Sequence, residues 1–248
     1  MAKTISISRD RRVLIAVIHL LPLPGSPRWG EDLEKVVVAA LDDARACEDG
    51  GADAVIIENF GDIPFSKGAV PPETIAAMAV VGAAVRDAVG LPLGFNVLRN
   101  DGHADLALCA ACGGAFIRIN VLSGAMVTDQ GLIEGNAFAV TRMRRQLAPN
   151  TKILADVHVK HASPLGSVPI EIAARDTAER GLADALVVSG AATGEAADLD
   201  ELRRVRSACP EIPLLVGSGV TTSNAAAHLE FADGILVGTS VKRDGTVF

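Results

Sequence analysis

The segment GGADAVIIEN (residues 50–59) places a small-residue stop and an aspartate directly before an apolar, strand-like run. The same order recurs three more times, in GGAFIRIN (113–120), GLADALVVSG (181–190) and FADGILVGTS (231–240). Four further apolar runs alternate with these: VLIAVIHL (13–20), LPLGFNVL (91–98), KILADVHV (152–159) and IPLLVGSG (212–219). Near-continuous apolar strands are typical of a parallel sheet that helices cover. The chain therefore has eight strand-like runs, spaced as repeated strand–helix units require.

Helical patterns fill the intervals between these runs. We expect helices over 31–51, 71–90 and 171–181, because each has apolar residues at helical spacing and ends at a glycine. Eight strand–helix units in 248 residues predict an α/β protein, a closed (β/α)8 TIM barrel. An open doubly wound sheet is the alternative, but the first strand runs into HLLPLPGSP (19–27) and not into a glycine-rich dinucleotide turn. We expect a single barrel domain over 1–248, with a short N-terminal extension of about residues 1–12.

Composition excludes several classes of protein. The formal net charge is −7, Tyr is absent and Trp occurs once, so the chain lacks the basic face and stacking platforms of a nucleic-acid-binding protein. No apolar run reaches the ~18 residues of a membrane span, and MAKTISISRDRR (1–12) does not resemble a secretory signal. Four cysteines do not make a disulfide framework, and we expect Cys109 and Cys112 to be packed thiols. A cytoplasmic location is expected.

Polar residues gather where the predicted strands end. In a TIM barrel the chemistry lies at the carboxyl ends of the strands, in the loops that follow them. A purely structural protein would have no reason for this asymmetry, so we interpret these positions as the edge of a site. They are His19, Glu58, Asn59, Asn96, Arg99, Asn100, Arg118, Asn120, Asp156, His158, Ser189, Ser218, Thr239 and Ser240.

Two glycine–hydroxyl turns follow the last two strands. VGSGVTTSN (216–224) contains Gly217, Ser218 and Gly219, and ILVGTSVK (235–242) contains Gly238, Thr239 and Ser240. Glycines let backbone N–H groups approach an anion, and loops at this place in the barrel frequently hold phosphate. The sequence therefore predicts a barrel of the phosphate-binding type; ordinary tight turns are the alternative. A third small-residue turn, Ser189 to Gly194 and including Gly190, is a further candidate contact for a polar ligand.

The stretch ILADVHVKHA (153–162) places ionisable groups at every second position. Side chains alternate along a strand, so Asp156, His158 and Lys160 are expected to share one face, toward the barrel interior. Arg118 and Asn120 have the same alternation on the neighbouring strand. A buried charge needs a partner, so we expect Asp156 to have partners among Arg118, Lys160 and His158.

Several roles fit these side chains. His158, oriented by Asp156, would be a general acid or base, and Lys160 would neutralise an anion or form a Schiff base. A second interpretation is a divalent cation held by Glu58, Asp156 and His158, and a third is an ion network that only braces the barrel. His19 closes the first strand and is a candidate for ligand contact. The segments 60–74 and 123–135 are interpreted as long loops, the first of them a candidate lid.

The assembled motifs resemble the BtpA/SgcQ family, whose name derives from a photosystem I biogenesis factor. The resemblance implies a phosphate-binding TIM barrel and, from the family name, a biogenesis role. It covers nearly the whole chain and is carried by HLLPLPGSP (19–27), DAVIIENFGDIPF (53–65), FNVLRND (95–101), FIRINVLSGAMVTDQGLIEG (116–135), ILADVHVKHA (153–162), LADALVVSGAATG (182–194), VGSGVT (216–221) and LVGTSVKRDG (236–245).

Three functional hypotheses follow. The first is an enzyme, an isomerase, lyase or hydrolase, that acts on a small phosphorylated metabolite such as a sugar phosphate or a nucleotide-like compound. Its catalytic candidates are Asp156, His158, Lys160, Arg118, Glu58 and His19, and its binding candidates are Asn96, Asn120, Ser189, Gly190, Gly217, Ser218, Gly219, Gly238, Thr239 and Ser240. The second is a non-catalytic factor of the photosystem I assembly type, and the third is a hydrolase that depends on a divalent metal. No nucleic acid partner or transmembrane segment is expected; barrels of this size often self-associate, so a homo-oligomer is considered.

Overall fold

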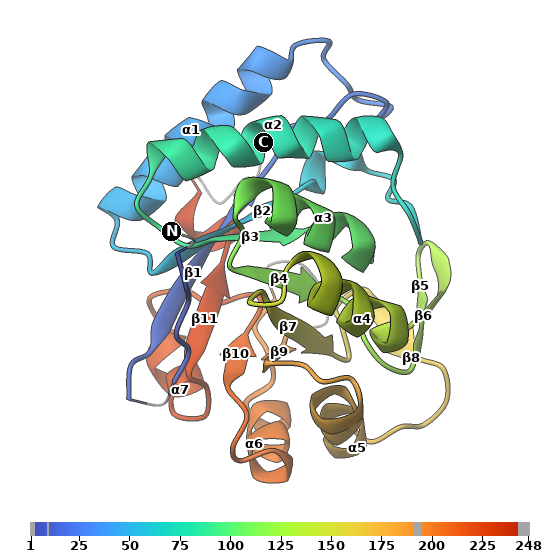
Figure 1. Cartoon of the computed structure of the whole chain (residues 1–248). Helices are drawn as coiled ribbons and strands as arrows, with labels where there is room; N and C mark the ends of the chain where they lie inside the picture. The colour runs from blue at the N-terminus through green and yellow to red at the C-terminus, as the bar shows by residue number, and fades with distance from the viewer. Residues whose placement is uncertain (1–2, 9, 191–194, 243–248) are drawn as a thin grey trace.

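Eight parallel strands close into a barrel in the order β1-β11-β10-β9-β7-β4-β3-β2. The computed structural model describes residues 3–8, 10–190 and 195–242. In Figure 1 the first and last barrel strands, drawn in blue and red, lie side by side, and Val13 pairs with Gly234. The predicted TIM barrel is confirmed, with each predicted run containing one strand. The barrel strands are β1 (Val13–His19), β2 (Ala54–Glu58), β3 (Leu93–Asn96), β4 (Phe116–Ile119), β7 (Lys152–Val157), β9 (Ala185–Val188), β10 (Leu214–Val216) and β11 (Gly234–Val237).

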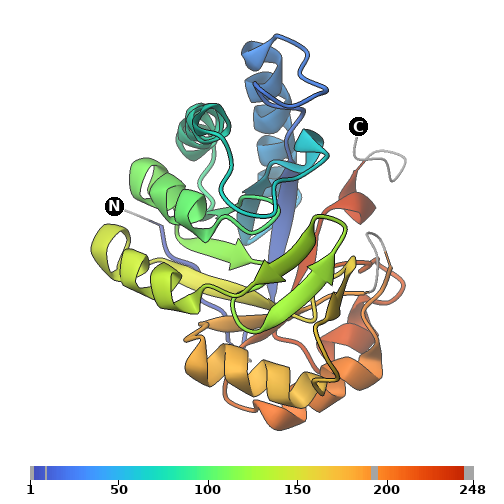
Figure 2. The same cartoon turned by 90° about the vertical axis from the view of Figure 1, so that its right-hand side faces the viewer.

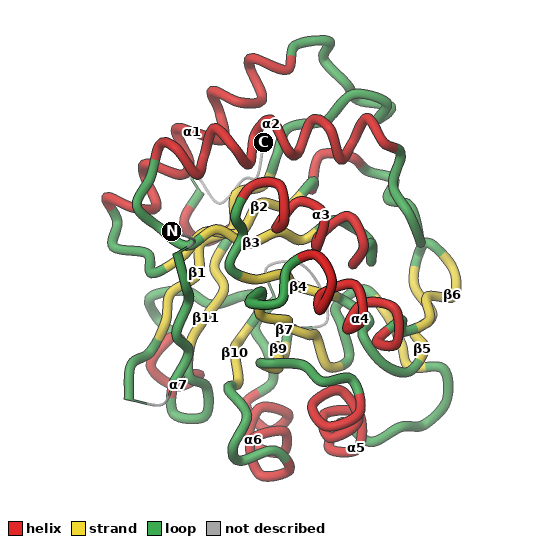
Figure 3. Tube along the Cα trace, viewed as in Figure 1, coloured by secondary structure: helices red, strands yellow, loops and turns green. Residues whose placement is uncertain are grey.

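Helices surround the strands, as Figure 3 shows in red around yellow. Aspartates begin three of the longer ones: the side chains of Asp32, Asp101 and Asp198 accept from backbone N–H groups of the first turn. The three predicted helical segments are confirmed; the third continues from α5 into a π-helical turn, Asp176–Arg180. The helices are α1 (Leu33–Asp49), α2 (Pro72–Ala88), α3 (Gly102–Cys112), α4 (Ala137–Leu147), α5 (Ile170–Arg175), α6 (Leu199–Ala208) and α7 (Ala225–Leu229).

An apolar layer fills the barrel interior below the strand ends. Phe116 is its largest side chain, and its ring occupies the space beside Gly94, where an added Cβ would lie 2.3 Å from the ring. Interior packing of this density leaves no room for water. We call this set the apolar layer; it comprises Val13, Ile15, Val17, Ala54, Ile56, Ala115, Phe116, Leu154, Ala185, Val187, Leu215 and Leu236, with Ile5 packed against it.

A small antiparallel sheet lies beside the barrel, where we had expected only a loop. β5 (Ala125–Thr128) and β6 (Gly131–Glu134) form a hairpin, and β8 (Ala162–Pro164) pairs with β5. Figure 2 shows the hairpin on the side of the barrel that faces the viewer. Met126 and Ile133 pack against Val121 and Val159, which gives the hairpin its own small core. Because β8 begins two residues after Lys160, this sheet fixes the segment that carries Lys160.

The two thiols of the CxxC motif are packed, as expected. Cys109 and Cys112 are buried on α3, and their Sγ atoms lie 3.5 Å from the carbonyl oxygens of Phe116 and Ala79. Burial raises the pKa of both thiols, so neither is a reactive thiolate near neutral pH. In the part of the chain that the structure describes, no helix is both long and apolar enough to cross a membrane.

Candidate active site

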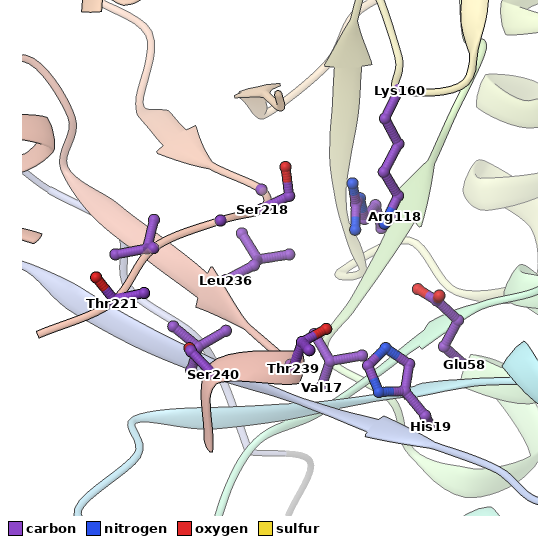
Figure 4. A pocket seen from close by; sticks show the side chains of 15 residues that line it. Val17, His19, Glu58, Arg118, Lys160, Ser218, Thr221, Leu236, Thr239 and Ser240 are labelled. Atoms are coloured by element: carbon purple, nitrogen blue, oxygen red, sulfur yellow. The ribbon is translucent and has the colours of Figure 1, made fainter. Parts of the chain in front are cut away.

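A cavity of about 170 Å³ opens at the carboxyl ends of the strands. Figure 4 shows His19, Glu58, Arg118 and Lys160 on one side of it and Ser218, Thr221 and Ser240 on the other. Charged groups thus face hydroxyl and glycine turns across one space. The lining residues are Val17, His19, Glu58, Arg118, Lys160, Gly217, Ser218, Gly219, Val220, Thr221, Leu236, Val237, Gly238, Thr239 and Ser240.

Strand register brings the polar side chains to one level of the barrel. His19 of β1 pairs with Glu58 of β2, and Glu58 in turn pairs with Asn96 of β3. Each of these residues lies two positions beyond a more deeply placed interior residue, so its side chain points the same way, one pleat nearer the mouth. The sequence thereby builds a polar layer directly above the apolar layer.

Arg118 and Asp156 form a fully buried ion pair in this polar layer. The Nη2 atom of Arg118 lies 3.1 and 3.2 Å from the two carboxylate oxygens, and the side chains are 2% and 0% exposed. Asn120 donates to the same carboxylate at 2.6 Å, and Arg118 also donates to Ser189 Oγ at 3.4 Å. Burial alone would lower the pKa of Arg118, but Asp156 and Glu58 outweigh it and hold the pKa above its usual value. Of the candidate partners of Asp156, Arg118 is therefore the one that forms the ion pair.

Glu58 and Lys160 face the cavity without such a partner. Among the described residues, neither side chain makes a hydrogen bond or an ion pair. Burial lowers the pKa of Lys160, Glu58 opposes that effect, and the nearby Arg118 and Arg99 add to it. Since an unpaired charge is costly to bury, these two groups are candidates for contact with a ligand.

Arg99 contributes to the position of Lys160, a contact that the sequence did not reveal. Its Nη2 atom donates to the carbonyl oxygen of Lys160 at 2.5 Å, while its buried Nε has no hydrogen-bond partner in the described chain. Burial lowers the pKa of Arg99, and the carboxylates of Asp156, Asp129 and Glu58 oppose that shift. The feature of the sequence that indicated a role for Arg99 near the site was its position just after β3.

His19 is a neutral imidazole at this site. Burial lowers its pKa to about 4, although Glu58 acts in the opposite direction. The ring packs on Phe60 with 4.8 Å between centroids, and in Figure 4 it lies between Glu58 and Thr239. A Cβ at Gly238 would lie 2.5 Å from the Cε1 atom of His19, so this glycine is required for the ring to lie there.

The two glycine turns line the opposite wall. A Cβ at Gly217 would lie 2.5 Å from Ser189 Oγ and 3.2 Å from Arg118 Nη2, and Gly219 adopts a left-handed φ of +65°. Within the described residues, the backbone N–H groups of Gly219, Thr239 and Ser240 donate no hydrogen bond. The Ser218 hydroxyl, in contrast, is engaged by the Gly190 N–H and by the carbonyl oxygen of Glu195. Thr221, absent from our candidates, also lines this wall.

His158 does not line the main cavity; it lines another one, which Asp156 also borders. Strand β7 ends at Val157, and His158 adopts a left-handed φ of +51°, which ends the alternation that predicted a common face. His158 instead lines a separate cavity of about 190 Å³, bordered by Met126, Pro164 and Ala173. Lys160 returns to the main cavity although the strand has ended.

The candidate cation ligands do not converge. Glu58 lines the main cavity, whereas Asp156 and His158 line the separate one, and Asp156 is held in its ion pair with Arg118. Among the described residues, no group of three or more His, Cys, Asp and Glu side chains is arranged to hold a metal ion.

Four binding candidates support the wall and do not line it. Asn96 donates to the carbonyl oxygen of Arg118 at 2.9 Å and to Asn120 at 3.2 Å. Ser189 accepts from Arg118, and Gly190 donates to Ser218. Of the predicted turn Ser189 to Gly194, residues 191–194 lie outside the described residues.

The family model described as "BtpA family" matches residues 10–248. The chain belongs to the BtpA family. It is 46% identical over 234 residues to the photosystem I biogenesis protein BtpA of Synechocystis, covering 94% of this chain and 82% of that protein. An uncharacterized protein of Thermococcus kodakarensis is 50% identical over 238 residues (96% and 90% covered). The sgc region protein SgcQ of Escherichia coli is 35% identical over 238 residues (94% and 87% covered).

Solved structures of TIM barrels share this fold at low sequence identity. The N-acetylmannosamine-6-phosphate 2-epimerase of Clostridium perfringens matches with a TM-score of 0.59 at 13% identity, covering 94% of this chain and 88% of that one. The phosphoribosyl anthranilate isomerase of Thermus thermophilus matches with a TM-score of 0.56 at 12% identity, covering 94% and 91%. At these identities the likeness shows the fold alone.

Proposed function

We propose that this protein is an enzyme that acts on a small phosphorylated metabolite at the mouth of the barrel. The phosphate lies between the turns Gly217–Gly219 and Gly238–Ser240, and the reacting part faces Glu58, Lys160 and His19. One observation carries the proposal: two opposite charges without a partner among the described residues line the same cavity as two glycine turns.

The wall of turns suits a phosphate for a physical reason. Free backbone N–H groups at Gly219, Thr239 and Ser240 can donate to phosphate oxygens, and the bare glycines allow a close approach. The cavity of about 170 Å³ is smaller than the ~300–1,000 Å³ of most ligand sites, which favours a compact metabolite over a nucleotide. The epimerase and isomerase of the same fold act, by name, on phosphorylated compounds, which agrees with this class of substrate.

An isomerase or lyase fits the cavity better than a metal-dependent hydrolase. The hydrolase needs Glu58, Asp156 and His158 around one cation, and these side chains do not converge. Glu58 and Lys160 instead supply a base and a cation on their own, without a metal.

A role in photosystem I biogenesis is the second candidate. It is favoured by the 46% identity to the Synechocystis protein that carries that name. A factor that only binds a partner would tolerate the loss of Glu58 and Lys160, whereas an enzyme would not.

The test is a thermal-shift titration with inorganic phosphate and ribose 5-phosphate. A ligand at 100 times its Kd adds about 2.7 kcal/mol of stability, which raises the Tm of a chain this size by about 5–10 °C. Thr239→Asp places a negative charge in the phosphate turn and should abolish the shift, while Ser6→Asp, at an exposed position, should leave it intact. The proposal fails if neither compound raises the Tm, or if T239D responds as the wild type does.

A further inference from the structure

We propose that the protein interconverts a phosphorylated aldose and the corresponding ketose. In this reaction Glu58 moves a proton between the carbonyl carbon and the adjacent carbon that bears a hydroxyl group. The inference rests on the proposed function and names its substrate class: short sugar phosphates with a hydroxyl beside the carbonyl.

The first argument is the separation of tasks within the cavity. The turns at Gly217–Gly219 and Gly238–Ser240 occupy one wall, and the side chains of Glu58 and Lys160 occupy the other (Figure 4). Arg118 lies on the side of Glu58 and Lys160, and its guanidinium reaches Gly217. A substrate held by its phosphate at the turns must present its far end to those three groups. In a short sugar phosphate, that far end is the hydroxycarbonyl group.

The second argument is the charge of the side chains around the far end of the substrate. Two cations, Arg118 and Lys160, line the cavity beside one carboxylate, Glu58, and the carboxylate of Asp156 is already taken by Arg118 and Asn120. A neutral carbonyl compound gains little from the unpaired Lys160 ammonium. An oxyanion that forms from that carbonyl gains much more, and stabilising a developing charge is what accelerates a reaction.

The proposed step balances without a co-reactant. The Glu58 carboxylate removes the proton from the carbon that bears the hydroxyl, the C–H electron pair forms a C=C bond, and the carbonyl π pair moves onto oxygen. Lys160 stabilises the resulting enediolate. The protonated Glu58 then returns its proton to the former carbonyl carbon. The proton of the second oxygen is transferred to the first oxygen, so the first becomes a hydroxyl group and the second becomes the new carbonyl.

His19 suits this step because it is neutral. With its pKa near 4, the ring does not compete with Lys160 as a cation at pH 7, and it does not pair with Glu58 as an imidazolium. A neutral ring can still donate a hydrogen bond to an oxygen of the enediolate.

The alternative chemistry for this cavity is an imine between Lys160 and the substrate carbonyl. It requires Lys160 as a free amine: burial lowers the pKa of Lys160 toward that state, whereas Glu58, which faces the same space, opposes the shift and favours the ammonium. Borohydride distinguishes the two, because it reduces an imine to a permanent adduct on lysine and leaves an enediolate enzyme unlabelled.

The experiment is proton exchange in D2O. The full-length protein is incubated with dihydroxyacetone phosphate, ribose 5-phosphate or glucose 6-phosphate, and the C–H signals next to the carbonyl are followed by proton NMR. We expect one probe to exchange its proton and convert to its isomer. Glu58→Gln should slow the exchange by about 100-fold or more, since general bases contribute about 10²–10⁴-fold. Glu134→Gln, which changes an exposed carboxylate on β6, is the matched control and should exchange at the wild-type rate.

The outcomes separate this inference from the proposed function. Thermal shifts by a probe without exchange of its proton would overturn the inference and leave the phosphate site standing. Exchange that survives in E58Q, or a borohydride adduct on Lys160, would also overturn it. If no probe binds, both fail. Exchange lost in E58Q, with the thermal shift of that variant unchanged, would support both.

Discussion

The two layers of the barrel interior are built by the same strands and differ in purpose. Phe116, Leu154 and Ile56 belong to the apolar layer, and one pleat nearer the mouth the same strands carry Arg118, Asp156 and Glu58. In the lower layer every side chain has its packing partners. In the upper layer Arg118 and Asp156 satisfy each other, whereas Glu58 and Lys160 have no partner within the described chain. We therefore expect the lower layer to stabilise the fold and the upper layer to carry the charges that the proposed function requires.

The largest expected effect comes from the buried ion pair between Arg118 and Asp156 in the upper layer. Arg118→Met leaves the Asp156 carboxylate buried without its cation, and breaking a buried pair from one side costs about 3–5 kcal/mol. We expect that loss in the free energy of unfolding, measured by urea denaturation at pH 7. The double variant R118M/D156L removes both charges and should recover most of the loss. A double variant as unstable as R118M would show that packing, and not the unpaired charge, is responsible.

Two glycines sharpen the comparison, one from each layer. Gly94→Ala forces a methyl group into the Phe116 ring, and overpacking a core of this kind costs about 1–3 kcal/mol. In Gly238→Ala the added methyl group contacts the His19 ring beside the open cavity, so we expect a smaller loss of stability. We also expect this variant to lose the thermal shift that ribose 5-phosphate produces. Denaturation curves and ligand titrations of both variants check this. The distinction between the layers would be refuted if G94A abolished ligand binding while G238A retained it.

The third effect depends on pH and comes from His19. Burial depresses its pKa from 6.5 to about 4 in the folded state, so the unfolded chain binds this proton more tightly. Stability is therefore complete above pH 6.5, falls as the pH drops below it, and levels off below pH 4. Between pH 7.5 and 5 the loss from this residue is about 2 kcal/mol. His19→Gln should lose correspondingly less over that interval in urea denaturation; equal losses in both proteins would contradict the buried, neutral ring.

The sequence was sufficient to predict the barrel and many of the residues at its mouth. Both predictions rest on the alternation of side chains between the two faces of a strand, which repeats every two residues. Apolar runs that end in polar residues identified Glu58, Arg118 and Asp156, and glycines after the last strands identified the turns. The same rule failed at His158, since a strand cannot signal in its side chains that the backbone will turn left-handed after Val157. The β5–β6 hairpin was missed because its strands are four residues each and half exposed. The contact from Arg99 to the Lys160 carbonyl joins residues 61 apart, which no local pattern reveals.

The most direct test of a phosphate site at this mouth is a crystal structure of the protein with bound ribose 5-phosphate. The account predicts that the phosphate lies between Gly217–Gly219 and Gly238–Ser240 and that the sugar carbonyl end faces Glu58 and Lys160. Electron density for the ligand in the cavity beside His158, or a phosphate bound against Lys160 with the turns empty, would contradict it.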